Sequence, residues 1–422
     1  MPYTDINNNP ISPAQNPYIG AGSAASVADQ DTRVYIVPTR AIKTVLEGVR
    51  RALQFNRSIR LFFVGDYGYG KTTHLNLIAK EVRTLNGICI PVQFQRLPLR
   101  TSNDPEEDLL RLQGAILAKI SSVLDKEGLV SREDTRKILD ESSYVDLIEG
   151  IYEMLNKTHQ TKILLIFDEI EILFSKLKID IPDFMSFLHG LSEKMFVRPG
   201  WGICASITQR EYYSKIIEEA GQLQEGRFGF HIIEPLSSQE VREYIEEKNS
   251  RLTNRVKERG YPFDKEVIDF ITVVSGGIPR YIETVCELMW SEAEANQEPD
   301  QLIKVETARR IFSNKYLSNA NKYFAELCRS FYLSNEAEAF LKLLFYSGGW
   351  RKTTQDLLAL KDSSPISYFH GLSESQAKYR LNQASPELRN NQELTTVLEV
   401  FGKRPFKYTL KNLVFKSIFD FR

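Results

Sequence analysis

The feature that most constrains the fold of this chain is a glycine-rich segment that fits the pattern G-x-x-x-x-G-K-[ST]. The apolar residues 59–64 before it predict a buried strand, and residues 73–82 after it have apolar side chains at helical spacing. A glycine loop between a strand and a helix turns its backbone N–H groups toward a bound phosphate. The candidate nucleotide-binding residues are therefore Gly65, Asp66, Tyr67, Gly68, Tyr69, Gly70, Lys71, Thr72 and Thr73.

The residues at the end of the glycine loop and those after a second apolar run suggest individual roles in binding and hydrolysing a nucleotide. The Lys71 ammonium is expected to reach the β- and γ-phosphates of ATP, and the Thr72 hydroxyl to ligate Mg²⁺. A second apolar run ends in Asp168 and Glu169. The carboxyl ends of parallel strands meet at one edge of a sheet, so Asp168 is expected beside the loop, where it would hold Mg²⁺ through water. Glu169 would polarise the attacking water, whereas Glu171 is expected to be an exposed or ion-paired carboxylate outside the site.

Composition argues against several classes of protein. The 422 residues are enough for two or three domains, and a hydrophobic content of 42% suffices for packed cores. A formal net charge of −1 gives no overall attraction to polyanions. The four cysteines include no C-x-x-C pair and the histidines lack ligand spacing, so a zinc site is not expected. Because there is no apolar run of roughly 18 residues and no signal peptide, we expect a cytoplasmic protein without membrane contact.

The order of predicted elements indicates a parallel α/β sheet covered on both faces. The predicted strands, which alternate with amphipathic helices, are residues 59–64, 87–95, 162–167, 201–207 and 228–233. Only helices are predicted from about residue 237 to 312. We therefore expect a flexible tail at 1–32, an α/β nucleotide-binding domain at 33–235, a helical lid at 236–318 and a further domain at 330–422.

This order of motifs and elements resembles the AAA+ superfamily of ATPases, and within it the origin-recognition and initiator clade. The resemblance implies a five-stranded core and a helical lid that bind ATP and Mg²⁺ between them, with residues 35–38 along the adenine pocket. Thr208 falls where the clade has its first sensor residue, which contacts the γ-phosphate or orients the water. Many relatives have Asn at that place, and the alternative is a threonine that caps a helix at 209–218.

Two arginines extend the resemblance. Arg227 precedes the fifth predicted strand, as does the arginine that members of the clade offer to the γ-phosphate of a neighbouring subunit, and Arg210 is a competing candidate. The segment Gly276-Gly277-Ile278-Pro279-Arg280 resembles the second sensor motif, whose arginine projects from the lid to the nucleotide. A surface position for Arg227 and an ion pair between Arg280 and Glu283 are the alternatives.

The last part of the chain looks like a winged-helix domain. It has 13 Lys or Arg against 9 Asp or Glu over residues 331–422. Lys378 and Arg380 fall on the third predicted helix, and Lys403 and Arg404 on the hairpin turn, where they could contact the phosphates of double-stranded DNA. A domain that contacts protein is the alternative. The predicted helices are 336–344, 353–360 and 373–381, the predicted strands are 394–401 and 406–410, and 383–392 fits a loop as well as a helix.

These features together predict an ATP-dependent, DNA-associated AAA+ ATPase of the initiator or loader type, which hydrolyses ATP at interfaces between its own subunits. A helicase-type protein or a separate effector is a further expected partner. Two alternatives stay open. One is a P-loop switch that controls a protein partner in signalling or anti-phage defence, and the other is a transposition-type regulator that polymerises on DNA through its nucleotide-binding body.

Overall fold

The computed structural model describes residues 39–94, 105–131, 133, 147–160, 162–176, 179–208, 216, 228–252, 263–295, 303–362, 364, 366–402 and 404–419. These residues fall into two compact units that divide between Glu234 and Pro235, here called the sheet unit and the C-terminal unit. The expected tail at 1–32 and the adenine-pocket residues 35–38 lie outside the described residues. Within those residues, no helix has the length and apolar character needed to cross a bilayer.

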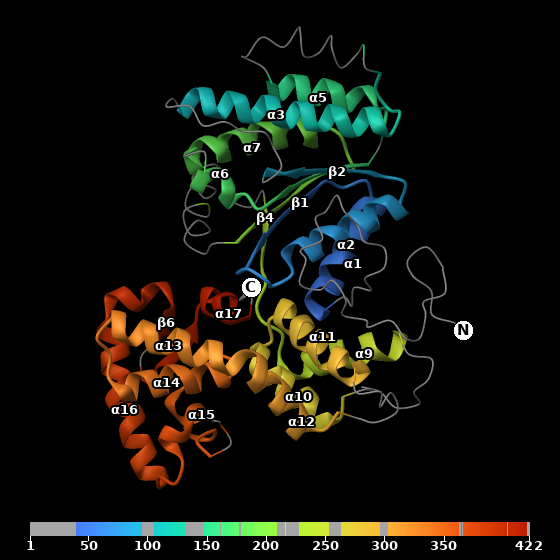
Figure 1. Ribbon diagram of the computed structural model, residues 1–422. Coiled ribbons are helices and arrows are strands. Elements are labelled where there is room, and N and C mark those ends of the chain that lie inside the picture. The colour runs from blue at the N-terminus through green and yellow to red at the C-terminus, as the bar shows by residue number, and fades with distance from the viewer. Residues whose placement is uncertain are drawn as a thin grey trace. The chain divides into compact units, whose positions relative to one another are not determined.

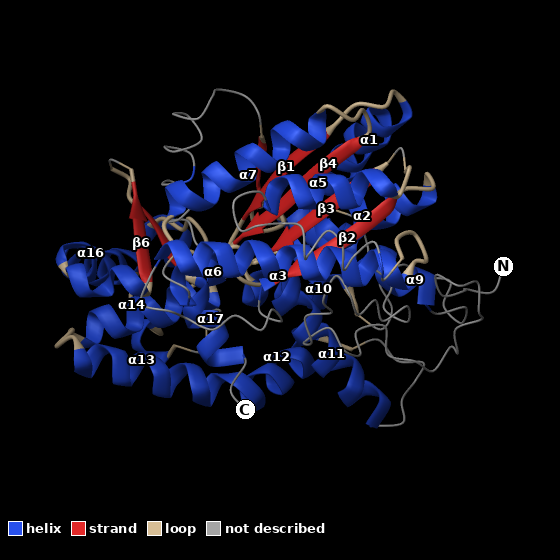
Figure 2. Ribbon diagram, turned by 90° about the horizontal axis from the view of Figure 1, so that it is seen from above, coloured by secondary structure: helices blue, strands red, loops and turns tan. Residues whose placement is uncertain are grey.

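The sheet unit is built on five parallel strands in the order β2-β3-β4-β1-β5. Figure 2 shows β2, β3, β4 and β1 of this sheet. The strands are β1 (Ile59–Val64), β2 (Ile88–Gln93), β3 (Ile163–Asp168), β4 (Trp201–Ile207) and β5 (Gly229–Ile232). Every residue of β3 and β4 is buried, as expected for parallel strands covered on both faces. The predicted parallel α/β sheet is therefore confirmed, with β2 shorter than predicted at both ends.

Helices cover both faces of this sheet (Figure 1). One face holds α1 (Arg40–Gln54) and α2 (Lys71–Thr84), and the other holds α3 (Pro105–Lys126), α5 (Leu147–Lys157) and α7 (Ile181–Phe196). The short helix α6 (Glu171–Lys176) follows β3 directly. The long connection between β2 and β3 contains α3 and α5, which form part of the helical layer on one face of the sheet.

The C-terminal unit begins with the helices that were predicted as a lid. They are α9 (Ser238–Leu252), α10 (Lys265–Ser275), α11 (Pro279–Ala295) and α12 (Val305–Phe312). A π-helical turn, Ser313–Leu317, continues α12 into α13 (Ser318–Ser330). The buried ammonium of Lys248 on α9 binds the carboxylate of Glu283 on α11, which also accepts the Tyr244 hydroxyl. This pairing satisfies a charge that would be costly to bury alone.

Three helices, a hairpin and a final helix complete the unit. They are α14 (Asn335–Tyr346), α15 (Thr354–Leu358), α16 (Glu374–Asn390), β6 (Leu398–Phe401), β7 (Lys407–Leu410) and α17 (Asn412–Phe419). Helix α16 continues beyond residue 381 because Ala384 and Leu388 extend its buried face. A 3₁₀ turn, Gln392–Thr396, precedes the hairpin, so β6 begins later than the predicted 394.

Aromatic side chains connect α17 to two other parts of this unit, namely α11 and the π-helical turn Ser313–Leu317. Tyr281 of α11 is fully buried, and its ring stacks on Phe415 and Phe419 of α17 at centroid distances of 5.5 and 4.9 Å. Tyr316 lies 4.7 Å from the ring of Phe419. Offset aromatic contacts of this kind stabilise a core beyond the area that they bury. The last helix therefore belongs to the same core as α11.

We expect Gly277→Ala to destabilise the C-terminal unit. Gly277 has a φ of 72°, and a Cβ there would lie 2.2 Å from the Leu236 carbonyl oxygen, while the Leu236 N–H donates to the Gly277 carbonyl at 2.8 Å. The free energy of unfolding should fall by at least about 2 kcal/mol, measured by urea denaturation. Gly371→Ala is the matched control, since Gly371 has a φ of 71° with open space around it. Equal losses in the two variants would contradict the contact argument.

Candidate active site

The glycine loop connects β1 to α2 through a tightly folded backbone. Gly68 and Gly70 both have a φ of 86°, in the left-handed region that favours glycine, and Gly70 is the N-cap residue of α2. A Cβ on Gly65 would lie 3.1 Å from the Ile233 carbonyl oxygen, so the loop begins against the end of β5. Tyr69 is buried, while Asp66, Tyr67 and Thr73 are half-buried. The loop thus closes over the N-terminus of α2, whose first N–H groups have no partner within the helix.

Lys71 is the first residue of α2 and is only 6% exposed. Its Nζ donates to the carbonyl oxygens of Gly65 at 2.9 Å and Asp66 at 3.0 Å. Burial lowers the pKa of Lys71, and nearby carboxylates, with Glu171 the largest influence and Asp168 the next, raise it. An ammonium held inside an anion-binding loop is the group that pairs with the terminal phosphates of a nucleotide.

An oxygen pair joins the loop to β3. The Thr72 hydroxyl donates to Asp168 Oδ2 at 2.8 Å, and Asp168 is buried at the end of its strand. A hydroxyl and a carboxylate are hard oxygen ligands, and Mg²⁺ takes one or two of them together with phosphate oxygens and waters. The residues present therefore fit Mg²⁺ bound with a nucleotide.

Ser206 of β4, which was not among the residues predicted from the sequence, contacts both Asp168 at the end of β3 and Glu169 after it. Its hydroxyl donates to Asp168 Oδ1 and accepts the Glu169 backbone N–H at 3.1 Å. The signal in the sequence was a polar residue inside the apolar run 201–207. In the structure, Phe167 pairs with Ala205 in the parallel register, so Ser206 lies level with Asp168. The pairing of β3 with β4 was needed to use that signal.

Glu169 occupies an uncommon backbone conformation. Its φ is 60°, and the chain turns there from β3 into α6, with the Ile172 N–H donating to the Glu169 carbonyl at 3.1 Å. A non-glycine residue in the left-handed region is uncommon and costs free energy, so such residues cluster at functional sites. The turn presents the Glu169 side chain at the edge that also carries Asp168 and the loop.

Glu171, which the sequence predicts to be an exposed or ion-paired carboxylate outside the site, is half-buried in the first turn of α6. Its half-buried carboxylate accepts the Thr208 backbone N–H at 3.0 Å and has the largest electrostatic influence on the ammonium of Lys71. Sequence alone did not reveal the role because the contact joins the first turn of α6 to the residue after β4. Thr208 itself is half-buried at the end of β4, at the same sheet edge as Asp168.

His74 is a second residue that the sequence analysis missed. Its Nδ1 lies 2.7 Å from the Gly70 carbonyl oxygen, and because a carbonyl only accepts, Nδ1 carries the proton. Burial lowers the pKa of His74 to about 4, so the ring is neutral near pH 7. The His74 ring also packs against Phe63 with centroids 5.5 Å apart. A histidine one helical turn after the last loop glycine was the signal, and its hydrogen bond joins the side chain to that glycine.

The three predicted arginines are Arg210, Arg227 and Arg280. Arg210 and Arg227 lie outside the described residues. Arg280 is the second residue of α11, in the C-terminal unit, and is half-buried. Glu283, which the sequence offered as its ion-pair partner, binds Lys248 and Tyr244.

Comparison with solved structures identifies the fold. The Aeropyrum pernix ORC2 protein, solved in ADPNP–ADP complexes, matches with a TM-score of 0.51 and 16% identity over 93% of this chain and 96% of that chain. The Aeropyrum pernix ORC1 protein in complex with DNA (TM-score 0.46, 12% identity, 95% of each chain) and AMPPCP-bound DnaA from Aquifex aeolicus (TM-score 0.40, 13% identity, 88% and 94%) are more distant. Comparison of the sequence with protein families and with curated proteins finds no match.

The chain therefore has the fold of the Aeropyrum pernix ORC2 protein, in agreement with the AAA+ fold that the order of sequence motifs predicts. This likeness in fold adds to the site geometry but does not by itself assign an activity.

Proposed function

We propose that this protein is a cytoplasmic, ATP-dependent and DNA-associated ATPase that acts as an initiator- or loader-type molecular switch. The observation that supports this most strongly is the hydrogen bond of 2.8 Å between Thr72 of the glycine loop and Asp168 of β3. It joins the phosphate-binding loop after β1 to the acidic end of β3, which is the arrangement that ATP hydrolysis with Mg²⁺ requires.

The chemistry follows from four side chains. Lys71 and the loop N–H groups would bind the β- and γ-phosphates, and Thr72 and Asp168 would hold Mg²⁺, which would supply positive charge to offset the charge that develops on the phosphates. Glu169 orients and polarises the attacking water. Most of the rate enhancement in such a site comes from positioning and electrostatic stabilisation, so these residues must be held in a fixed geometry.

We propose that hydrolysis also needs residues beyond this cluster. Thr208 would contact the γ-phosphate or the water, and Arg280 would report the presence of the γ-phosphate to α11. Arg227 would come from a neighbouring subunit, because a permanently charged guanidinium can bind phosphate with two hydrogen bonds.

Arg227→Ala is expected to leave ATP binding unchanged and to lower assembly-stimulated hydrolysis about 10³-fold, the usual effect of losing an arginine supplied in trans. Turnover measured against protein concentration, with the oligomer size monitored in parallel, gives the test. Arg210→Ala is the comparison variant, since Arg210 is the competing candidate. Full hydrolysis by normal oligomers of the Arg227 variant would exclude Arg227, and loss only in the Arg210 variant would transfer the role.

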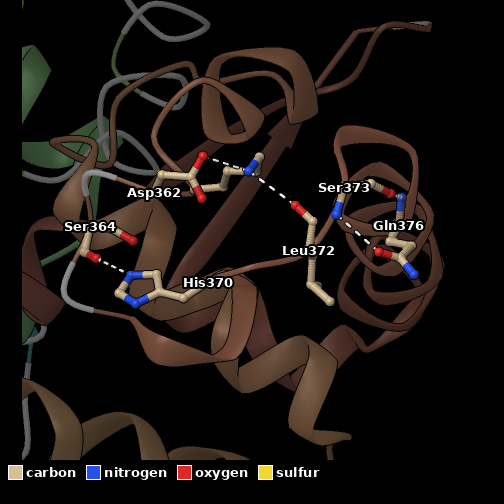
Figure 3. Close-up of polar contacts among 7 residues, drawn as sticks. Asp362, Ser364, His370, Leu372, Ser373 and Gln376 are labelled. Atoms are coloured by element: carbon tan, nitrogen blue, oxygen red, sulfur yellow. Dashed lines mark hydrogen bonds and ion pairs between the residues drawn. The ribbon is translucent and has the colours of Figure 1, made fainter.

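The proposed DNA contact lies in the part of the C-terminal unit that the sequence predicts to be a winged-helix domain, where a capping box begins α16. The Ser373 hydroxyl accepts the Gln376 N–H at 3.2 Å while the Gln376 side chain accepts the Ser373 N–H at 2.9 Å, a reciprocal cap (Figure 3). The ring of His370 lies 2.6 Å from the Ser364 carbonyl oxygen in the preceding turn. Lys378 is exposed on α16 and Arg404 is exposed on the hairpin turn, so both can reach phosphates.

The combined variant Lys378→Glu with Arg404→Glu is expected to weaken duplex DNA binding at least about tenfold. The slope of log affinity against log salt concentration should also become less steep, by the amount expected for the loss of about two phosphate contacts. Fluorescence anisotropy at several salt concentrations measures both. Lys322→Glu is the control, since Lys322 is an exposed lysine on α13 in the same unit. Point variants are preferable to a truncation after α12, because α17 shares a core with Tyr281. Unchanged binding would remove this surface from the proposal.

One observation favours the alternative of a switch directed at a protein partner. Three guanidinium groups of this region lie over aromatic rings of the same unit, namely Arg380 over Tyr368 at 4.7 Å, Arg389 over Phe406 at 4.0 Å and Arg351 over Trp350 at 5.2 Å. Such stacking engages part of the positive charge that DNA would use. Tyr379, which is 63% exposed on α16, is a side chain typical of protein interfaces.

A further inference from the structure

Ser206 lies on the strand between the two halves of the candidate site. In the sheet order, β4 separates β1, which leads into the glycine loop, from β3, which leads into Asp168 and Glu169. Figure 2 shows β4 between β1 and β3. Ser206 is the second-last residue of β4 and is fully buried. A polar side chain buried to this degree must have hydrogen-bond partners, and its partners indicate what it does.

Ser206 makes three hydrogen bonds to three consecutive residues. Its hydroxyl donates to Asp168 Oδ1 and accepts the Glu169 N–H at 3.1 Å, and its carbonyl oxygen accepts the Ile170 N–H at 3.1 Å. The Asp168 carboxylate therefore has one oxygen on Ser206 and the other, Oδ2, on Thr72 at 2.8 Å. Hydrogen bonds to both carboxylate oxygens fix the plane of the group that we assign to Mg²⁺.

The same hydroxyl stabilises the backbone conformation of the next residue. Glu169 has a φ of 60°, which is unfavourable for a residue with a Cβ. A backbone at such an angle persists only where surrounding contacts define it. The Ser206 hydroxyl supplies such a contact at the Glu169 N–H, and the Ser206 carbonyl supplies another at the following residue.

We propose that Ser206 is a positioning residue for hydrolysis, whose single hydroxyl sets the orientation of the Asp168 carboxylate and the backbone angle of Glu169 together. This inference rests on the proposed ATPase function. Ser206 itself touches neither phosphate nor water in this role; it acts through Asp168 and Glu169. It is distinct from Thr208, which lies after the end of the strand and whose N–H donates to Glu171.

Loss of the hydroxyl has two separable consequences. In Ser206→Ala, Asp168 Oδ1 loses its donor, so the carboxylate is less well oriented for Mg²⁺. The Glu169 N–H loses its acceptor at the same time, so the left-handed turn loses support. The glycine loop and Lys71 do not contact the hydroxyl in the described hydrogen bonds, so affinity for the nucleotide without Mg²⁺ should change little.

The test compares wild-type protein with Ser206→Ala and Ser206→Thr. The Mg²⁺ concentration that half-saturates the binding of a fluorescent ATP analogue is measured first, and kcat and KM for ATP are measured next. For Ser206→Ala we expect the half-saturating Mg²⁺ concentration to rise about tenfold and kcat to fall about 10- to 100-fold, with KM changed less than about twofold. Ser206→Thr retains the hydroxyl and should restore both quantities to within about threefold of wild type.

Ser192→Ala is the matched control for removing a buried hydroxyl. Ser192 is also fully buried in the sheet unit, but its hydroxyl donates at 2.9 Å to the His189 carbonyl within α7. This variant should leave the Mg²⁺ requirement and kcat unchanged. If the methyl group added in Ser206→Thr prevents folding, which the melting temperature reveals, Ser206→Cys replaces that variant; a near-isosteric thiol is a weak hydrogen-bonding group and should behave like alanine.

Several outcomes would overturn the inference. One is a wild-type Mg²⁺ requirement and kcat in Ser206→Ala, and another is a folded Ser206→Thr variant as defective as Ser206→Ala. A Ser206→Cys variant with wild-type values would overturn it as well. If the wild-type protein binds ATP but does not hydrolyse it, the proposed ATPase function fails, and the Mg²⁺ requirement alone then decides whether Ser206 orients Asp168.

Discussion

Lys71→Ala is expected to lower the affinity for ATP by at least about 100-fold, or about 2.7 kcal/mol. The Lys71 ammonium is only 6% exposed and lies inside the glycine loop, where its Nζ is 2.9 Å from the Gly65 carbonyl oxygen. Its charge-assisted bonds to phosphate would form at a buried position, where electrostatic interactions are screened least. Titration of a fluorescent ATP analogue at saturating Mg²⁺ measures the loss.

The control for this prediction is Lys80→Ala. Lys80 is an exposed lysine on the same helix, α2, so its removal changes the charge of the helix by the same amount without touching the loop. The control should bind ATP as the wild-type protein does. A Lys71 variant with wild-type affinity would show that the glycine loop is not the nucleotide site.

Glu169→Gln is expected to retain ATP binding and to reduce kcat by about 10²- to 10⁴-fold, the range for removal of a general base. Glutamine has the shape of glutamate but cannot accept a proton, and the Glu169 backbone N–H keeps its bond of 3.1 Å to Ser206. Single-turnover hydrolysis separates the chemical step from product release, so it should show the same reduction.

Glu153→Gln provides the comparison, because Glu153 is an exposed carboxylate on α5 of the same unit. Its turnover should equal that of the wild type. Normal turnover by the Glu169 variant would require a different base, and Glu171 would then be examined first, since its carboxylate already lies within reach of Thr208 at 3.0 Å.

Much of the sheet unit was predictable because its signals are local. Apolar runs such as 59–64 and 201–207 are typical of buried strands, and a glycine loop followed by a lysine defines where α2 begins. The rule that parallel strands end at one edge then predicts that Asp168 lies near the loop, and Thr72 is indeed 2.8 Å from it.

The residues that the sequence did not reveal depend on contacts between distant segments. Ser206 is one serine in an apolar strand until β4 pairs with β3, and Glu171 is an ordinary acid until the end of β4 lies beside α6. In the C-terminal unit, the polar stretch after residue 381 gave no clear helical signal. The structure extends α16 through it because Ser385 reaches the Tyr408 hydroxyl and Leu388 is buried.

Binding of labelled duplex DNA by the full-length protein in ATP and Mg²⁺, compared with ADP and Mg²⁺, at two salt concentrations, tests the central claim most directly. We expect tighter binding with ATP and weaker binding at higher salt, because phosphate contacts release counterions. Binding in neither nucleotide state would contradict the DNA-associated function and would favour a switch that acts on a protein partner.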